Sequence, residues 1–379
     1  MRLLDCCKIS NQSVSKYEGT KKYIATGDII NNNIVTYEEY YYDSKPSRAN
    51  LQIEEGTVIF AKMKDTIKVL IGNKDNKNNI YSTGFCSLIP NDNILSKYLF
   101  YYLNSESFNK QKNKYSSGAT QQAINNEKLK KIMIKEVPTL ENQKEIINKL
   151  DTIMSLIEYK KRQIDKLNEL VKSQFVEMFE NKKFPYVQFK EYMERCVDIG
   201  SNGANAVVME HYNMTDTKDF AMVIRFTNLN SGDFENDVKY INKEDYEFYS
   251  KSKVYGDEII FCKIGSAGMN YIMPKLNMPV TLGLNQIMVT SKNINIRYLY
   301  EYINSYEGKK YINNNINGAV TKTITKHALW DFPIKTPPIE LQNKFAQIVE
   351  QIDKQKFEFE NSLKKLEELK NSLMQEYFG

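Results

Sequence analysis

Residues whose side chains could do catalytic chemistry are few and widely separated in this sequence. The two histidines, His211 and His327, lie more than a hundred residues apart, and neither belongs to an H-x-E or HExxH pattern of the kind that zinc enzymes use. The five cysteines are an odd number without any CxxC spacing, which fits neither a disulfide framework nor a zinc site. We therefore expect free thiols, and no metal or cofactor in this chain.

Motifs of nucleotide, methyl-transfer and nuclease chemistry are also missing. No GxxxxGK[ST] loop occurs, and the Gly-Ser-Ala-Gly segment at 265–268 is too short for a dinucleotide fingerprint. The segment closest to an [ND]-P-P-[YF] methyltransferase motif is Thr-Pro-Pro-Ile at 336–339, which opens a predicted helix, and the E-x-K spelling at 368–370 lies inside that helix. The sequence thus predicts a protein without catalysis of its own, against the alternative of a nuclease or methyltransferase fused to a recognition module.

Polar residues around two Gly-Ala pairs are candidates for binding DNA. The tracts 112–124 and 314–324 each place Gly-Ala ahead of polar, amide or basic residues and an isoleucine. Glycine permits close backbone approach to a phosphate, and the flanking side chains can donate to phosphates or to base edges. An ordinary turn before a strand would explain each residue equally well. The candidates are Ser117, Thr120, Gln121, Gln122, Thr321, Lys322 and Thr323.

Five basic residues on predicted loops are further candidates. Lys62 and Lys64 follow one predicted strand, Lys263 follows its counterpart, and Arg48 and Lys275 lie on other loops. Loops carry binding residues more often than cores do, although an isolated lysine is usually a solvated surface residue. The net charge of +5 is also uneven, since segments 139–180 and 337–379 together carry −3 and the remaining residues +8. This distribution favours an anionic partner for the parts outside those two segments.

An internal repeat must position these candidates. At a shift of about 200 residues the two halves of the chain match in the same order, which indicates two copies of one architecture. We interpret the matched segments 24–29 and 56–62, with their counterparts 224–229 and 256–263, as strand cores. Further matches join Tyr-Leu-Phe-Tyr-Tyr-Leu-Asn-Ser at 98–105 to Tyr-Leu-Tyr-Glu-Tyr-Ile-Asn-Ser at 298–305, and the two Gly-Ala pairs.

Each half ends in a long predicted helix. Pro-Thr-Leu-Glu at 138–141 and Pro-Pro-Ile-Glu at 337–340 place proline and an acid where helices begin. Apolar residues then recur at spacings of three and four, which forms a heptad seam in each helix. Some forty residues make a rod of roughly 60 Å, so we expect the two helices to pack antiparallel within the chain, with Lys160, Gln174, Gln355 and Ser362 fixing the register. The alternative is a coiled coil with a second chain.

The predicted fold is therefore α+β, with two repeated domains of mixed β-sheet and small helices, separated by two long antiparallel coiled-coil helices with a pseudo-twofold repeat. Four segments follow from this division: 1–138, 139–181, 182–336 and 337–379. No apolar run approaches the eighteen or so residues of a membrane span, and the residues after Met1 lack the apolar core of a signal peptide. We expect a cytoplasmic protein without a membrane partner.

Three motifs resemble the specificity subunits of Type I restriction-modification systems: Thr-Gly-Asp-Ile at 26–29, Gly-Ala-Thr-Gln-Gln-Ala-Ile at 118–124, and Pro-x-[LI]-Glu-x-Gln before both long helices. The resemblance covers essentially the whole chain, twice over. It implies two target recognition domains and two conserved spacer helices that set the gap between half-sites and bind two modification subunits. It also implies partner-binding surfaces around Gln143, Ile157, Gln342 and Phe359.

The resemblance implies a subunit that recognises the DNA target and catalyses no reaction itself. Double-stranded DNA, two modification (methyltransferase) subunits and two restriction (motor nuclease) subunits are the implied partners, with S-adenosylmethionine and ATP/Mg on those partners. The first domain lacks the tryptophan and Gly-rich loop often found near the family's start, and Thr-Gln-Gln-Ala at 120–123 differs from Val-Thr-Lys-Thr at 320–323. The expected target is therefore bipartite and asymmetric. The alternatives are a coiled-coil scaffold and a stand-alone DNA-binding module without restriction partners.

Overall fold

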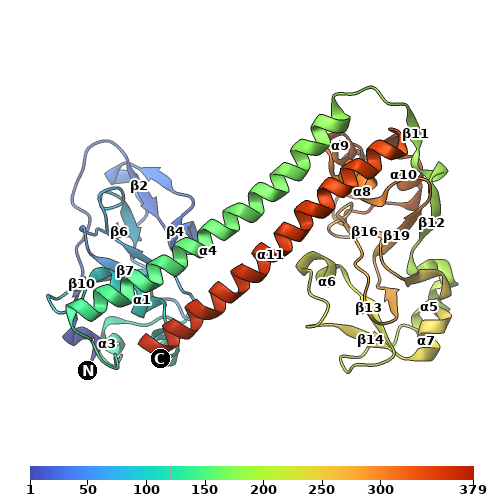
Figure 1. The fold of residues 1–379 in the computed structure, drawn as a ribbon. Helices are drawn as coiled ribbons and strands as arrows, with labels where there is room; N and C mark the ends of the chain where they lie inside the picture. The colour runs from blue at the N-terminus through green and yellow to red at the C-terminus, as the bar shows by residue number, and fades with distance from the viewer. Residues whose placement is uncertain (120) are drawn as a thin grey trace. The chain divides into compact units, whose positions relative to one another are not determined.

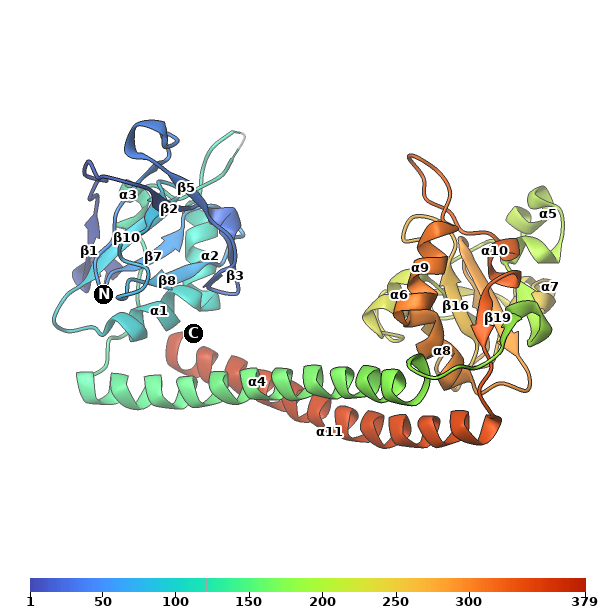
Figure 2. The same cartoon turned by 90° about the horizontal axis from the view of Figure 1, so that it is seen from above.

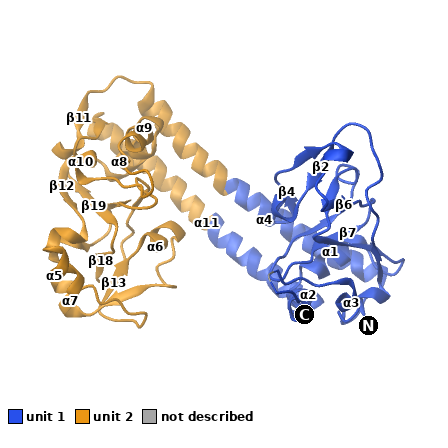
Figure 3. Cartoon of the chain, turned by 180° about the vertical axis from the view of Figure 1, so that it is seen from behind, with its two compact units in different colours: residues 1–163, 359–379 blue, residues 164–358 orange. Residues whose placement is uncertain are grey.

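The computed structural model describes residues 1–119 and 121–379, and the chain divides into two compact units (Figures 1 and 3). Unit 1 comprises Met1–Gln163 and Phe359–Gly379, and unit 2 comprises Ile164–Glu358. Each unit therefore contains one globular domain and parts of two long helices.

Unit 1 is built around two four-stranded sheets. The first sheet is antiparallel, with the order β1-β10-β7-β8, and the second has the order β5-β2-β9-β6 with β2 and β9 parallel. The strands are β1 (Cys7–Ser10), β2 (Lys21–Ile24), β5 (Glu38–Tyr40), β6 (Ala49–Leu51), β7 (Val58–Ala61), β8 (Val69–Ile71), β9 (Ile80–Ser82) and β10 (Phe85–Pro90), with a small hairpin of β3 (Ile29–Ile30) and β4 (Asn33–Ile34). The helices of this domain are α1 (Ser96–Asn104), α2 (Glu106–Tyr115) and α3 (Asn126–Leu129).

Unit 2 repeats the two four-stranded sheets of this plan. Its sheets have the orders β12-β19-β16-β17 and β14-β13-β18-β15, again with one parallel pair, β13 and β18. The strands are β12 (Met193–Val197), β13 (Ala221–Ile224), β14 (Lys239–Ile241), β15 (Lys253–Val254), β16 (Ile259–Cys262), β17 (Asn270–Ile272), β18 (Val280–Leu282) and β19 (Gln286–Ser291), and β11 (Tyr186–Gln188) pairs with β20 (Pro333–Lys335). The helices are α5 (Asn205–Glu210), α6 (Phe226–Ser231), α7 (Lys243–Phe248), α8 (Ile296–Asn304), α9 (Tyr306–Asn314) and α10 (Lys326–Trp330).

The central strands β7 and β16 are buried on both faces, which explains their unbroken apolar sequences. In β7, Val58 and Phe60 join the core that includes α1, whereas Ile59 and Ala61 join the core shared with the second sheet. Successive side chains of a strand point to opposite faces, so one strand serves both cores. Strand β16 divides its residues in the same way.

The prediction that segments 24–29 and 224–229 are strand cores is corrected by the structure. The strands end at Ile24 and Ile224, and a 3₁₀ turn (Thr26–Asp28) and α6 follow. Asp28 accepts a hydrogen bond from the Ala25 backbone N–H at 2.7 Å, and Asn228 accepts one from the Arg225 N–H at 3.3 Å. These capping interactions favour a helical turn over continued strand.

The two long helices run antiparallel within each unit. They are α4 (Leu140–Phe175), continued by a π-helical turn (Val176–Glu180), and α11 (Ile339–Phe378). In unit 1, Lys161 pairs with Glu367 at 3.1 Å and the Lys160 ammonium lies 4.3 Å from the Phe359 ring centroid. In unit 2 the rings of Phe175 and Phe345 lie 5.7 Å apart. The predicted antiparallel pair within one chain is confirmed.

A buried glutamine fastens each long helix to the domain before it. Gln143 is fully buried; its Oε1 accepts from the Leu95 N–H at 2.8 Å and its Nε2 donates to the carbonyls of Asn93 and Pro138, both at 2.8 Å. Gln342 repeats this geometry with the Asn295 N–H at 2.9 Å and the Pro337 carbonyl at 2.8 Å. The equal spacing from proline to glutamine in the two halves of the chain thus has a structural cause.

No helix among the described residues is long and apolar enough to cross a membrane.

Gln143→Ala should lower the free energy of unfolding of unit 1 by about 2–3 kcal/mol, because it leaves buried backbone groups without partners. Urea denaturation measures this loss. The matched control, Gln375→Ala, removes an exposed amide from the part of α11 that belongs to unit 1 and should cost no more than about 0.5 kcal/mol. Equal stabilities for the two variants would contradict the fastening role.

Candidate DNA-binding interface

In unit 1 the structure brings five of the predicted DNA-binding residues together. The backbone N–H of Lys64 donates to the Gln122 carbonyl at 2.9 Å, and the Ile124 N–H donates to the Lys62 carbonyl at 3.0 Å. The end of β7 therefore lies beside the loop that carries Ser117, Gln121 and Gln122. Thr120, which the sequence also predicts to bind DNA, lies outside the described residues.

This loop is a hairpin closed by its own backbone. The N–H of Ser117 donates to the Ala123 carbonyl at 3.1 Å, and the Ala123 N–H donates to the Ser117 carbonyl at 3.2 Å. Gly118 has a φ of +142°, and a Cβ at this position would collide with the Gln121 carbonyl oxygen. The glycine is therefore required by the hairpin itself, a cause that the sequence interpretation, which invoked close approach to phosphate, did not include.

Unit 2 contains the same arrangement. Asn317 and Thr323 exchange backbone hydrogen bonds of 2.8 and 2.9 Å, and the Ile324 N–H donates to the Lys263 carbonyl at 3.0 Å. Gly318, with a φ of +101°, faces the Thr321 carbonyl as Gly118 faces that of Gln121. Lys263, Thr321, Lys322 and Thr323 thus occupy one edge of their domain.

Both hairpins project from their domains. Within each unit of Figure 2 the hairpin extends from the side of the domain away from α4 and α11. Gln121, Gln122, Thr321 and Lys322 are exposed, and Val320 is 96% exposed. Exposed amide, hydroxyl, ammonium and methyl groups are the groups that contact phosphates and base edges in DNA complexes.

The two remaining basic candidates differ in position. The Arg48 carbonyl accepts from the Thr83 N–H at 2.9 Å, and the adjacent Gly84 carbonyl accepts from the Lys62 N–H at 2.9 Å, so Arg48 lies at the Lys62 edge. Lys275 pairs with Asp257 at 2.8 Å, just before β16 begins, whereas Lys263 follows its end. The structure therefore does not bring Lys275 together with the other candidates.

Lys263 belongs to an ion-pair network that the sequence did not reveal. Its Nζ lies 2.7 Å from one oxygen of Asp198, and the Nζ of Lys326 lies 3.0 Å from the other. Burial raises the pKa of Asp198, but hydrogen bonds from both lysines and from Ser201 outweigh it and lower the pKa to about 2. Asp198 and Lys326 are 65 and 63 residues from Lys263 along the chain, so no local motif could have joined them.

A buried lysine positions the hairpin edge of unit 1. Lys112 is 1% exposed, and its Nζ donates to the carbonyls of Ala61, at 3.4 Å, and Thr66. It therefore holds both ends of the segment that carries Lys62 and Lys64. Burial lowers the pKa of Lys112 to about 8.

The predicted partner-binding residues mark the inner side of the long helices. Gln143 and Gln342 are buried and hydrogen-bonded, Ile157 is 5% exposed, and Phe359 is half-buried against Lys160. These side chains therefore make their contacts within the chain.

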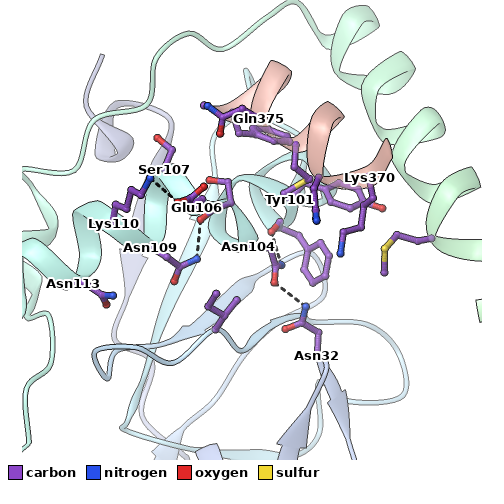
Figure 4. A pocket seen from close by; sticks show the side chains of 18 residues that line it. Asn32, Tyr101, Asn104, Glu106, Ser107, Asn109, Lys110, Asn113, Lys370 and Gln375 are labelled. Carbon is purple, nitrogen blue, oxygen red and sulfur yellow. Dashed lines mark hydrogen bonds and ion pairs between the residues drawn. The ribbon is translucent and has the colours of Figure 1, made fainter. Parts of the chain in front are cut away.

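Each unit has a cleft where the long helices meet the domain. In unit 1, a cavity of about 700 Å³ is lined by α1, α2, Met154 of α4 and the end of α11 (Figure 4). Asn32 crosses its floor to donate to Asn104 at 2.8 Å. In unit 2, a cavity of about 630 Å³ is lined by α8, α4 and α11, with Arg297 paired to Asp353 at 3.1 Å.

The histidines and cysteines fill packing roles. His211 pairs with Asp245 at 2.9 Å and stacks on Phe248, and His327 lies against Trp330. The five cysteines are free thiols. Among residues 1–119 and 121–379, no group of three or more His, Cys, Asp and Glu side chains could hold a metal ion.

Comparison with known proteins places this duplicated architecture among DNA-recognition proteins. Residues 2–169 and 209–371 match the family described as type I restriction modification DNA specificity domain, so the match covers most of the chain in two copies. The chain belongs to this family. It is a specificity subunit of a type I restriction-modification system, which recognises a DNA target and is itself non-catalytic.

One curated relative and two solved structures are similar to this chain. A putative type I restriction enzyme MjaX specificity subunit from Methanocaldococcus jannaschii is 28% identical over 306 residues, 74% of this chain and 68% of that relative. A solved structure described as "Structural basis underlying complex assembly and conformational transition of the type I R-M system" gives a TM-score of 0.59 at 17% identity, over 100% of this chain and 96% of that one. The type I restriction-modification S subunit from M. genitalium gives 0.57 at 15% identity, over 99% and 94%. The two structures support the fold.

Asp198→Asn should lower the free energy of unfolding of unit 2 by about 2 kcal/mol at pH 7, because a depressed pKa represents stabilisation of the folded state. The folded-state pKa of about 2 lies below the ordinary 3.8. The stabilisation is therefore complete above about pH 4 and disappears as the pH falls toward 2, where variant and wild type should converge in urea denaturation. The control Glu194→Gln removes an exposed carboxylate, and a gap that stays constant with pH would refute the prediction.

Gly118→Ala and Gly318→Ala should each weaken target DNA binding by about tenfold or more, because the added Cβ opens the hairpin that presents the exposed side chains. Fluorescence anisotropy with the assembled complex measures the loss. Gly27→Ala is the control, since its Cβ would meet no heavy atom within 4 Å. Wild-type affinity in both hairpin variants would exclude these loops from the interface.

Proposed function

We propose that this specificity subunit recognises a bipartite, asymmetric DNA site, with one half-site read by each recognition domain. The observation that carries this proposal is the repeated edge formed by a strand end and an exposed hairpin, at Lys62 with 117–123 and at Lys263 with 317–323. Two edges of equal construction favour two half-sites. Contacts with DNA are assigned to the candidates at these edges and in the first hairpin, and Lys275, which lies away from them, is left out. They are Arg48, Lys62, Lys64, Ser117, Thr120, Gln121, Gln122, Lys263, Thr321, Lys322 and Thr323.

The chemistry of the two edges supports different half-sites. The first hairpin ends in Gln121 and Gln122, whose amides can bond an adenine in bidentate fashion, whereas the second presents Val320, Thr321 and Lys322, which suit a thymine methyl group, a phosphate or a guanine. Lys263 is paired with Asp198, and Lys62 has no carboxylate within ion-pair distance among the described residues. An asymmetric target follows from these differences.

The long helices are proposed to hold the other subunits. Large apolar side chains on their exposed faces, Tyr159 in unit 1 and Phe357 in unit 2, support docking of one modification subunit per unit. Restriction subunits join that complex in the cytoplasm. The partner subunits, and not this chain, bind S-adenosylmethionine and ATP/Mg. The division into recognition domains 1–138 and 182–336 and spacer helices 139–181 and 337–379 belongs to the same proposal.

Removal of one heptad from α4 and the facing heptad from α11 should shorten the gap between the half-sites by about three base pairs, because seven helical residues span about 10 Å and one base pair about 3.4 Å. Each half-site should stay unchanged. Methylation profiling of DNA from cells that carry the complex reads both quantities.

Shortening α4 alone is the matched control, and it should abolish methylation because the two heptad seams no longer match. An altered half-site sequence after the paired deletion would refute the spacer role. A continuous palindrome as the wild-type target would refute the bipartite site.

A further inference from the structure

The two recognition domains share a lysine after the central strand but differ in the residues around it. Lys62 and Lys263 are equivalent, because each directly follows its central strand and donates its N–H to the turn before the next strand of the sheet, at Gly84 and Asn285. In unit 2 the Lys263 ammonium faces the carboxylate of Asp198, the residue after β12. The strand equivalent to β12 is β1, and the residue after β1 is Asn11.

A second equivalence completes the comparison. Lys326, which contacts the other oxygen of Asp198, begins α10 directly after the second hairpin, and its counterpart Asn126 begins α3 after the first. Unit 1 thus replaces an aspartate and a lysine with two neutral amides. The lysine of the central strand remains, without the carboxylate.

A polar cleft of about 200 Å³ is found at this place in unit 1. Its lining includes Asn11, Lys62, Thr83, Ser87 and Asn126, and we call it the Lys62 cleft. Asn11, Thr83 and Asn126 are exposed and Lys62 is half-buried, so the cleft opens to solvent at the edge that carries the hairpin.

The base of the Lys62 cleft contains a buried polar atom without a partner. Ser87 is 1% exposed, and its Oγ makes no hydrogen bond to any described residue. Ser87 pairs across the sheet with Ser10, whereas the equivalent pair in unit 2 is Val197 with Met288. A buried hydroxyl without a partner is costly to fold around, so two serines where the repeat has apolar residues indicate a site built for a polar ligand.

The donors of the cleft define the charge of that ligand. One ammonium and several neutral amides and hydroxyls suit a group with a single negative charge and several acceptor oxygens. A DNA phosphodiester is such a group. The charge of Lys62 disfavours a cation, and a phosphodiester neutralises that charge whereas a base edge offers it only neutral acceptors.

We propose that the Lys62 cleft binds one phosphodiester of the target DNA, whereas in the second domain the carboxylate of Asp198 occupies the equivalent anion position. The proposal rests on DNA recognition by the first domain at its hairpin edge. When the first domain binds DNA, it therefore neutralises one phosphate more than the second domain does and releases one more counterion. Asn11, Ser87 and Asn126 are assigned to binding that phosphate.

The test introduces a carboxylate into the first domain at Asn11, the position equivalent to Asp198. Asn11→Asp in the complex with modification subunits should weaken binding to a duplex carrying the target by about tenfold and reduce the slope of log K against log salt by about one, because one phosphate contact is lost. Lys62→Gln should produce the same two changes, and the double variant should add nothing to either. Asn11 is exposed and the new carboxylate can pair with Lys62, so the urea midpoint should stay the same or rise, and weaker DNA binding would not come from unfolding.

The matched control is Asn78→Asp, which adds the same charge on an exposed turn before β9. Its affinity and slope should equal those of the wild type, and an Asn11→Asp variant that behaves like this control would overturn the proposal. If the wild-type complex itself shows no salt-dependent DNA binding, the proposed reading of DNA fails instead, so the two failures are distinguishable.

The contacted phosphate is identified from the DNA side. Single neutral methylphosphonates are placed along the half-site of the first domain, and one position should weaken wild-type binding while leaving the Asn11→Asp variant unaffected. Free phosphate shares the ligand chemistry, so inorganic phosphate is exchanged for chloride at constant ionic strength. A rise in the wild-type melting temperature that Asn11→Asp abolishes, together with unchanged DNA affinity in that variant, would show a free-anion site and overturn the assignment to DNA.

Discussion

The buried amides of Gln143 and Gln342 attach the long helices to the recognition domains, and the rest of the structure depends on these two attachments. Each amide satisfies a backbone N–H before the first helix of a pair and a carbonyl before a long helix. Buried hydrogen bonds of this kind are directional, so they orient the long helix relative to its domain as well as attach it. Lys97 with Asp151, and Arg297 with Asp353, add an ion pair further along the same junctions.

Much of this fold could be predicted from the sequence, because the chain contains it twice. A match at a fixed shift needs no knowledge of strand pairing, and it correctly joined the β7 and β16 segments and the two long helices. The prediction of strand at 24–29 and 224–229 was wrong because Asp28 and Asn228 cap helical turns, and apolar spacing does not register such side-chain to backbone bonds.

The candidate site was predictable only in part. The hairpins and the lysines after the central strands were found because they lie in matched segments, and the structure places all but Lys275 of the described candidates at the hairpin edges. Asp198, Lys326 and Ser87 were missed, since their relation to Lys263 and Lys62 arises from sheet pairing between distant segments. The difference between Asn126 and Lys326, which occupy matched positions of the repeat, was the one signal in the sequence that could have indicated the ion pairs of Asp198.

The hairpins also bear on how such a protein changes over generations. Each is closed by a reciprocal pair of backbone hydrogen bonds, at 117 with 123 and at 317 with 323, and is joined to the neighbouring strand end by backbone atoms. Backbone bonds are indifferent to the side chains that project between them, apart from the glycine that each turn requires. Substitutions at the exposed tips are therefore nearly free of folding cost, and new sequence preferences can accumulate there while the scaffold and its partner surfaces are inherited intact.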